Sequence, residues 1–310
     1  MAIAIIGAGL AGLTAAQHLA AGGHTVIVFE KSKGLGGRMA TRCVGGVQFD
    51  HGAQYFRAKN QPFRDQIRHW QAQGCVAEWG DGAFVGTPRM TSPASFLAHG
   101  LQLRCNETVT ALAQTPQGWA ITTAEQQQAS QSLSTVILAI PAPQAIALVA
   151  TANIAMPELH LAHYAPCWAM MLSFAAQDMP TIATGRVDDP MISWIANDSQ
   201  KPDRSNAVPT LVIHATAAWS REHLELSQAE AGHRLLSRFQ QFIGHFPNPL
   251  LTLTHRWRYA LVEKPVGAPY LWQPKDRIGA CGDWCLGSKV EDAYDSGRAM
   301  AAAVLADTSA

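Results

Sequence analysis

The first thirty residues carry the pattern that most restricts how this chain can fold. An apolar run at residues 2–6 leads into Gly-Ala-Gly-Leu-Ala-Gly at residues 7–12, and a valine-rich run at residues 25–29 ends at Glu30. This order predicts a strand, a glycine turn, a helix and a second strand. No basic segment precedes the first run, so a secretory signal is not indicated. A packed Ala/Gly helix is the other alternative, but it does not explain the acidic residue at the end of the second run.

Each position of the glycine turn has a mechanical reason. Gly7 permits the tight turn, Gly9 lets the backbone approach a pyrophosphate, and Gly12 lets the helix pack on the sheet. The helix begins near Leu10 and Ala11, where unpaired N–H groups and the positive dipole end favour an anion. Glu30 lies where a carboxylate would accept hydrogen bonds from an adenosine ribose, and its charge disfavours a 2′-phosphate. These residues predict a dinucleotide site.

Composition excludes several classes of protein. The chain has 310 residues, 48% of them apolar and 15% charged, with 23 basic and 23 acidic side chains. This predicts a globular protein of one or two lobes with no nucleic-acid or membrane surface. Residues 135–156 are the most membrane-like stretch, but Pro141 and Pro143 break it. The six cysteines show no secreted-scaffold spacing, which indicates reduced thiols in a cytoplasmic protein.

A second glycine cluster follows Glu30 and ends in arginine, at residues 34–38. Such a loop can wrap the backbone around a dinucleotide, with Arg38 as a bidentate partner for an anion. A solvated loop with a surface arginine is the alternative. The pairing of G-x-G-x-x-G with a downstream G-G-R resembles the FAD-dependent amine oxidase superfamily, whose flavin domain is similar to that of glutathione reductase.

This resemblance implies a non-covalently bound FAD and names the residues that hold it. Gln54 and Tyr55 would line the flavin ring, a backbone group near Val109 would bond the adenine, and Asp283 would hold the ribityl chain. The helix after Gly287 would aim its N-terminus at the flavin pyrimidine, with Ser288 and Glu291 capping it. The full set of implied FAD residues is Gly7, Gly9, Leu10, Ala11, Gly12, Glu30, Lys31, Gly36, Gly37, Arg38, Met39, Gln54, Tyr55, Val109, Gly282, Asp283, Glu291 and Asp292.

The rest of the chain predicts an α/β fold: a Rossmann-type, glutathione reductase-like FAD domain with an inserted α+β substrate domain. Residues 1–58, 97–150 and 265–310 are assigned to the FAD domain, and residues 59–96 and 151–264 to the substrate domain. Alternation at residues 167–174, 191–197, 210–216 and 250–261 predicts a mostly antiparallel sheet. Residues 197–209 are polar and hold two prolines, which predicts a surface loop. Ser227 and Glu230 form a capping box before an apolar helical stripe.

Within the superfamily the chain is most similar to the bacterial renalase branch. The motifs are His-Arg-Trp-Arg-Tyr-Ala at 255–260, Cys-Gly-Asp-Trp-Cys at 281–285, Val-Gly-Thr-Pro-Arg-Met at 85–90 and Lys-Pro-Asp-Arg at 201–204. The resemblance implies an oxidase that takes a hydride from 2- or 6-dihydro-NAD(P). It would release NAD(P)+ and pass the electrons to dioxygen, giving hydrogen peroxide.

The expected pocket lining is Tyr55, His214, Trp257 and Trp284, with no general base, because a dihydropyridine that loses a hydride has no proton to remove. Core packing is the alternative for each tryptophan and for His214. Alternation places Trp257 with its neighbouring odd-numbered aromatic residues on one face of their strand.

Two other functions stay open from the sequence. A flavin amine oxidase would need an aromatic cage and often a lysine, for which Lys264 is the nearest candidate, and a non-catalytic flavin-binding redox module would lack the ring slot. Glu158, His160 and His163 lack a further ligand cluster, so no metal site is expected.

Overall fold

The computed structural model describes residues 2–126, 130–205, 207–244 and 247–308. The helices are α1 (Leu10–Ala21), α2 (Gln61–Ala72), α3 (Ser92–Leu97), α4 (Ala142–Thr151), α5 (Ala217–Glu222), α6 (Gln228–Ile243) and α7 (Val290–Thr308), with short 3-10 turns η1 (Gly37–Met39), η2 (Pro157–Leu161), η3 (Ala176–Asp178), η4 (Asp198–Gln200) and η5 (Asp283–Cys285). The strands are β1 (Ala2–Ile6), β2 (Val26–Glu30), β3 (Thr41–Val44), β4 (Val47–Asp50), β5 (Val76–Glu78), β6 (Phe84–Gly86), β7 (Gln102–Cys105), β8 (Val109–Thr115), β9 (Gly118–Thr123), β10 (Ser130–Leu138), β11 (His163–Ser173), β12 (Gly185–Arg186), β13 (Ile192–Asn197), β14 (Thr210–Ala215), β15 (Leu251–Lys264), β16 (Leu271–Gln273) and β17 (Ile278–Ala280).

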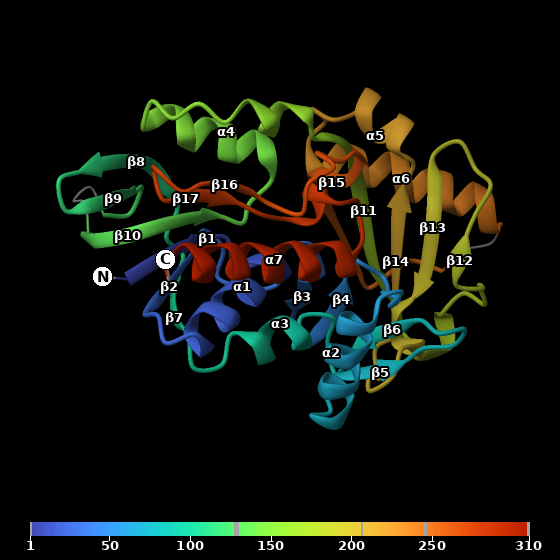
Figure 1. Cartoon of the computed structure of the whole chain (residues 1–310). Helices are drawn as coiled ribbons and strands as arrows, with labels where there is room; N and C mark the ends of the chain where they lie inside the picture. The colour runs from blue at the N-terminus through green and yellow to red at the C-terminus, as the bar shows by residue number, and fades with distance from the viewer. Residues whose placement is uncertain (1, 127–129, 206, 245–246, 309–310) are drawn as a thin grey trace.

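The larger sheet has eight strands and is built around β1. Its main path runs β16-β17-β10-β1-β2-β7, parallel from β17 to β7, while β8 and β9 extend it from β10 as an antiparallel hairpin. Side chains of β1 alternate between two cores: Ile3 and Ile5 pack with α1 and α7, and Ala4 and Ile6 pack with α4. Figure 1 shows these helices on the opposite faces of the sheet. The Rossmann-type prediction is therefore confirmed.

The second sheet has five antiparallel strands in the order β12-β13-β14-β11-β15. The four strands expected from alternation correspond to β11, β13, β14 and β15, so that prediction is confirmed. Helix α6 covers this sheet with the buried residues Leu235 and Phe239, and it begins with the predicted capping box, in which Ser227 and Glu230 each accept a backbone N–H from the other. The strand–helix contact forms a core separate from those of the larger sheet.

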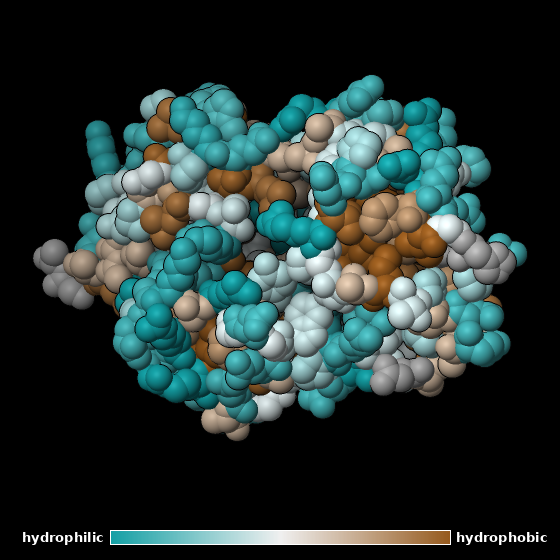
Figure 2. Space-filling view, turned by 90° about the vertical axis from the view of Figure 1, so that its right-hand side faces the viewer, coloured by the Kyte–Doolittle hydropathy of each residue, from teal (hydrophilic) through white to brown (hydrophobic). Residues whose placement is uncertain are grey.

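Two small hairpins, β3–β4 and β5–β6, form two-stranded sheets of their own. The hairpin of β3 and β4 lies between the eight-stranded and five-stranded sheets (Figure 1), where Phe49 is fully buried against Met171 and Val212 of the five-stranded sheet. Figure 2 views the end of the molecule that carries β12 and β13: most of this face is hydrophilic, and apolar side chains gather on one part of it. Across the described ranges, no helix combines the length and the apolar character needed to cross a bilayer.

Candidate active site

The loop between β1 and α1 contains three glycines in different surroundings. A Cβ atom on Gly7, whose φ is +105°, would lie 2.5 Å from the carbonyl oxygen of Ala139, and one on Gly12 would lie 2.1 Å from the carbonyl oxygen of Gly7. A Cβ atom on Gly9 would meet no described atom within 4 Å. Packing therefore requires glycine at the outer two positions, while Gly9 keeps an open approach to α1. No described side chain caps that helix, so its first N–H groups fit a pyrophosphate.

The carboxylate of Glu30, at the end of β2, bonds to the backbone of the β1–α1 loop. Its Oε2 accepts the N–H of Ala8 at 2.9 Å, and its Oε1 accepts the N–H of Ser32 at 2.8 Å. Each carboxylate oxygen has a second lone pair, so the fixed side chain can still accept from ribose hydroxyls. The backbone of Glu30 also accepts the N–H of Glu107, two residues before Val109 at the start of β8. The expected adenosine contacts therefore lie close together.

The second glycine cluster lies beside the first. The N–H of Gly36 donates to the carbonyl of Ala8 at 2.9 Å, and Gly36 pairs with Gly9 as an isolated bridge. Gly36 and Gly37 have φ values of +97° and +55°, which favour glycine. Of their neighbours, Met39 is buried and Lys31 is exposed.

Arg38 and Asp283 form an ion pair that joins the two ends of the chain. The guanidinium donates to both carboxylate oxygens, at 2.8 and 2.5 Å, and to the carbonyl of Ala260 at 3.2 Å. Asp283 follows Gly282, whose N–H donates to Ser296 Oγ of α7. The structure thus brings together two residues that the resemblance assigns to FAD, one in each glycine-containing loop.

The start of α7 is held differently from the expectation. Glu291 is buried, and its Oε1 accepts the N–H groups of Lys59 and Asn60 at 2.8 and 2.9 Å. The helix start is instead capped by Asp292, whose Oδ2 accepts the N–H of Lys289 at 2.9 Å. The capping expectation is therefore wrong for Glu291, because its carboxylate is turned toward the start of α2. An FAD contact for Glu291 and Asp292 stays a prediction.

The segment 50–56 packs closely against the second glycine cluster at the carbonyl of Arg38. The N–H of Ala53 donates to the carbonyl of Arg38 at 2.8 Å. A Cβ atom on Gly52 would lie 2.0 Å from that carbonyl oxygen and 3.4 Å from the Trp257 ring. The carbonyl of His51 accepts Trp257 Nε1 at 2.9 Å and lies 3.1 Å from His214 Nε2. This segment therefore lies between the FAD loops and the five-stranded sheet.

One face of the five-stranded sheet presents a row of side chains to this segment. The strand registers pair Arg186 with Trp194, Trp194 with His214, His214 with Ala169, and Ala169 with His255. Directly paired residues in antiparallel strands share a face. A guanidinium, an indole, two imidazoles and one small side chain thus cross the sheet in a line.

Aromatic rings fill the space between the row and the segment 50–56. The Tyr55 ring lies 5.7 Å from Trp194 and 6.5 Å from Trp79, and the guanidinium of Arg57 lies 5.5 Å from the Tyr55 ring. In the same region the Trp257 ring lies 5.0 Å from the His51 ring and is tilted by 31° relative to it.

Three of the four expected lining residues, Tyr55, His214 and Trp257, therefore meet around the segment 50–56. Trp284 is 1% exposed and donates to the carbonyl of Ile140 at 3.1 Å, so the core alternative describes it.

Burial keeps the imidazoles of this region neutral. It lowers the pKa of His51 to about 3, with the nearby His255 and Arg42 adding to the effect. Burial also lowers the pKa of His214 to about 4 and that of His255 to about 4, in the latter case assisted by Arg42. At neutral pH the region therefore offers uncharged rings.

Acid is expected to destabilise the protein through these histidines. A folded pKa below the unfolded value of about 6.5 means that unfolding takes up a proton, so the stability is complete above pH 6.5 and falls as the pH drops toward 4. For His51, His214 and His255 together, we expect the free energy of unfolding to fall by about 4 kcal/mol between pH 7 and pH 5.5. Denaturant titrations across this range measure it, and a His214→Asn variant should lose about a third of the slope. Equal stability at both pH values would contradict the prediction.

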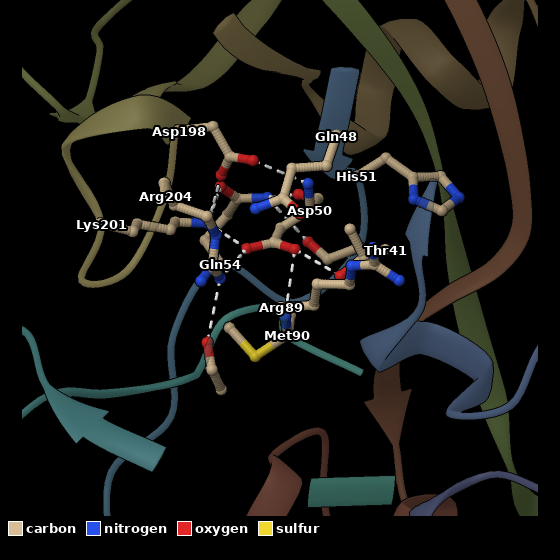
Figure 3. Close-up of polar contacts among 12 residues, drawn as sticks. Thr41, Gln48, Asp50, His51, Gln54, Arg89, Met90, Asp198, Lys201 and Arg204 are labelled. Carbon is tan, nitrogen blue, oxygen red and sulfur yellow. Dashed lines mark hydrogen bonds and ion pairs between the residues drawn. The ribbon is translucent and has the colours of Figure 1, made fainter. Parts of the chain in front are cut away.

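The loop 198–204 carries charged side chains that are buried. The sequence predicts a surface loop here, yet Asp198, Lys201 and Arg204 are buried and converge on the buried Asp50 of β4 (Figure 3). Arg204 Nη2 lies 2.6 Å from Asp50 Oδ2, and Lys201 Nζ lies 3.3 Å from the same oxygen and 2.6 Å from Asp198 Oδ1. Burial alone raises the pKa of a carboxyl, but Lys201 and Arg204 hold that of Asp50 at about 2. The surface-loop prediction is wrong for these side chains.

The comparisons with known proteins agree with this geometry. Residues 5–70 match the family model for an NAD(P)-binding Rossmann-like domain, and residues 80–305 match that for flavin containing amine oxidoreductases. Renalase from Mus musculus is 23% identical over 303 residues, covering 85% of this chain and 86% of that protein.

Solved structures show the same fold. A putative protoporphyrinogen oxidase from Exiguobacterium sp. 255-15 has a TM-score of 0.78 at 13% identity, with 98% of each chain covered. Cyclohexylamine oxidase from Brevibacterium oxydans IH-35A has a TM-score of 0.71 at 12% identity, covering 100% of this chain and 99% of that one.

Proposed function

Since the chain belongs to the family of flavin-containing amine oxidoreductases and is an FAD-dependent oxidoreductase, we propose that its substrate is an isomeric, 2- or 6-dihydro form of NAD(P). The dihydropyridine gives up a hydride and becomes the aromatic NAD(P)+ cation. The two electrons then reach dioxygen, which takes up the transferred hydrogen and one solvent proton to become hydrogen peroxide. Bound FAD supplies the hydride acceptor for this chemistry.

The observation that carries the proposal is the neutrality of the buried imidazoles around the segment 50–56. Hydride loss from a neutral dihydropyridine removes no proton, so the site needs position and flat surfaces more than a base. An amine substrate arrives mainly as an ammonium ion and must lose a proton. Imidazoles with pKa values of about 3 to 4 accept that proton poorly.

The aromatic and basic residues suit a dinucleotide. Tyr55, Trp79 and Trp194 offer ring faces against which a dihydropyridine can lie. Arg57 lies over the Tyr55 ring, and Arg186 ends the row at the sheet edge. Both guanidiniums are exposed, where they favour the phosphates of a dinucleotide over a cationic amine.

We propose that FAD is held non-covalently and that the chain divides as the sequence predicts. The strands of the eight-stranded sheet all fall within residues 1–58, 97–150 and 265–310, and those of the five-stranded sheet within residues 151–264. This supports an FAD-binding part and a substrate part. A cytoplasmic location is also proposed, on the grounds that the cysteines are free and show no scaffold spacing.

Oxidation of a small amine is the second candidate. The ring cluster of Tyr55, Trp79 and Trp194 favours it, since an aromatic cage would hold an amine. Lys264, the lysine expected from the sequence, is exposed at the end of β15, whereas the buried lysine near the rings is Lys201. A non-catalytic flavin-binding redox module is the third candidate.

Anaerobic reduction of the yellow protein tests the proposal. The purified protein is mixed without oxygen with 2-dihydro-NAD, 6-dihydro-NAD, NADH and a panel of amines, and flavin absorbance is followed. We expect rapid bleaching by a dihydro isomer and slow bleaching by NADH. Bleaching by amines alone would replace the proposal with the second candidate, and no fast reduction by any compound would favour the redox module.

A further inference from the structure

The proposed reaction gives no role to the buried ammonium of Lys201. The Lys201 side chain is 0% exposed, yet it belongs to a polar loop and lies beside the segment that the resemblance places against the flavin. Burying an ammonium is costly unless every N–H has an acceptor. Lys201 Nζ donates hydrogen bonds to Asp50 Oδ2 and Gln54 Oε1, each at 3.3 Å, and forms an ion pair with Asp198 Oδ1 at 2.6 Å. An ammonium has three donors and no acceptor, so this arrangement fixes its direction.

The contact with Gln54 orients an amide next to the imidazole row. Because Lys201 only donates, the amide must turn its oxygen toward Nζ and its NH2 group away. The NH2 group then donates to the carbonyls of Asp50 and Gly52, at 2.5 and 3.1 Å, and lies 3.5 Å from His214 Nε2. Figure 3 shows Gln54 against this charged cluster.

A second contact reaches the other side of Tyr55. Lys201 Nζ lies 5.5 Å from the centre of the Trp79 ring, and Trp79 packs against Tyr55. The same ammonium therefore touches the amide of Gln54 and the ring that supports Tyr55. A cation over an indole face is attracted to the ring electrons.

We propose that Lys201 is a positioning residue that sets the Gln54 amide and the Tyr55–Trp79 rings in the geometry needed for hydride transfer. Asp198 and Asp50 hold the ammonium in place, and the ammonium in turn fixes the Gln54 amide and the Trp79 ring. Only the rate measurement below rests on the proposed function, since the placement of Gln54 is observable in the protein itself.

The experiment separates position from charge balance. Lys201→Met leaves a buried carboxyl without its cation and should lower the melting temperature. Adding Asp198→Asn removes one carboxyl together with the one cation and leaves the Asp50–Arg204 pair intact, so the melting temperature should recover. If Lys201 positions the Gln54 amide and the Trp79 ring, anaerobic flavin reduction at saturating dihydro-NAD isomer should stay about tenfold slower in this double variant than in the wild type. Recovery of both stability and rate would overturn the proposal.

Gln54→Met supplies the matched control. It removes the acceptor of the Lys201 contact and should slow reduction, and the Lys201→Met/Asp198→Asn pair should slow reduction by a smaller factor in that background than in the wild type, since only the Trp79 contact is left to lose. Factors that multiply in full would show that Lys201 does not act through the Gln54 amide and would contradict the proposal.

A further readout does not depend on substrate. The side-chain amide resonance of Gln54, assigned by its loss in Gln54→Met, should shift in the Lys201→Met/Asp198→Asn protein, and an unchanged resonance would overturn the inference. If no isomer reduces the wild-type flavin, the proposed function fails while this resonance still decides the role of Lys201.

Discussion

Replacing Gly9 by valine is expected to weaken FAD binding by about 1000-fold, or about 4 kcal/mol, while the protein stays folded. Gly9 has φ −74° and ψ 175°, an extended conformation that valine adopts without strain. Its Cβ direction meets no described protein atom within 4 Å, so the new side chain costs little packing. It projects instead into the approach to the N-terminus of α1, where the pyrophosphate needs close contact with backbone N–H groups. Flavin titration of the deflavinated protein measures the affinity, and circular dichroism reports the fold.

Two other glycines calibrate this result. Gly185 of β12 also has open space at its Cβ position, so Gly185→Val should change neither FAD affinity nor folding. Gly12→Ala places a Cβ 2.1 Å from the Gly7 carbonyl oxygen, and we expect it to destabilise the fold itself. Normal FAD affinity in the Gly9→Val protein would show that the pyrophosphate does not approach α1 through this opening.

The Rossmann half could be predicted because its requirements are local. A glycine turn, a helix start and an acidic strand end are separated by short, fixed distances in sequence. The structure places Gly7, Gly12 and Glu30 in contacts that follow from those distances. The antiparallel strands were also predictable, since alternation reports one buried face regardless of which strand lies next to it.

The buried charge cluster could not be predicted, because its partners are distant in the chain. Lys201 contacts Asp50 across 151 positions and Gln54 across 147. Composition of the loop alone indicates solvent, since charged residues are rarely buried unless paired. The available signal was the Lys-Pro-Asp-Arg motif, which belonged to the resemblance and had no assigned role. Polar residues that match a family motif inside a loop are better interpreted as candidates for buried pairing.

The row of side chains from Arg186 to His255 could be predicted only in part, because it depends on the register between strands. Sequence alternation places Trp257 and His255 on one face, and their contact at 4.3 Å confirms it. Alternation within one strand does not set the register between strands. The alignment of His214 with Trp194 and Ala169 depends on pairings that only the assembled sheet provides.

Loss of the Arg38 guanidinium is expected to lower the free energy of unfolding by about 3 kcal/mol, the lower end for breaking a buried ion pair. The lower end applies because the Arg38 side chain is 29% exposed while that of Asp283 is 6% exposed. Arg38→Met leaves the buried carboxylate unpaired and removes the hydrogen bond to the Ala260 carbonyl. Denaturant unfolding of the flavin-free protein measures the change, and Arg64→Met, which removes an exposed guanidinium on α2, should leave stability nearly unchanged.

The Arg38–Asp283 double variant shows how much of this effect comes from the pair itself. Asp283→Asn alone leaves the guanidinium facing a neutral amide, and combining it with Arg38→Met removes both charges. If the two residues stabilise the fold through each other, the double variant should lose about 1 to 2 kcal/mol less than the sum of the single changes. Strictly additive losses would mean that Arg38 acts through the Ala260 carbonyl and Asp283 through its own surroundings. The N- and C-terminal FAD segments would then be joined by packing alone, and the ion pair would not set the distance between the second glycine cluster and α7.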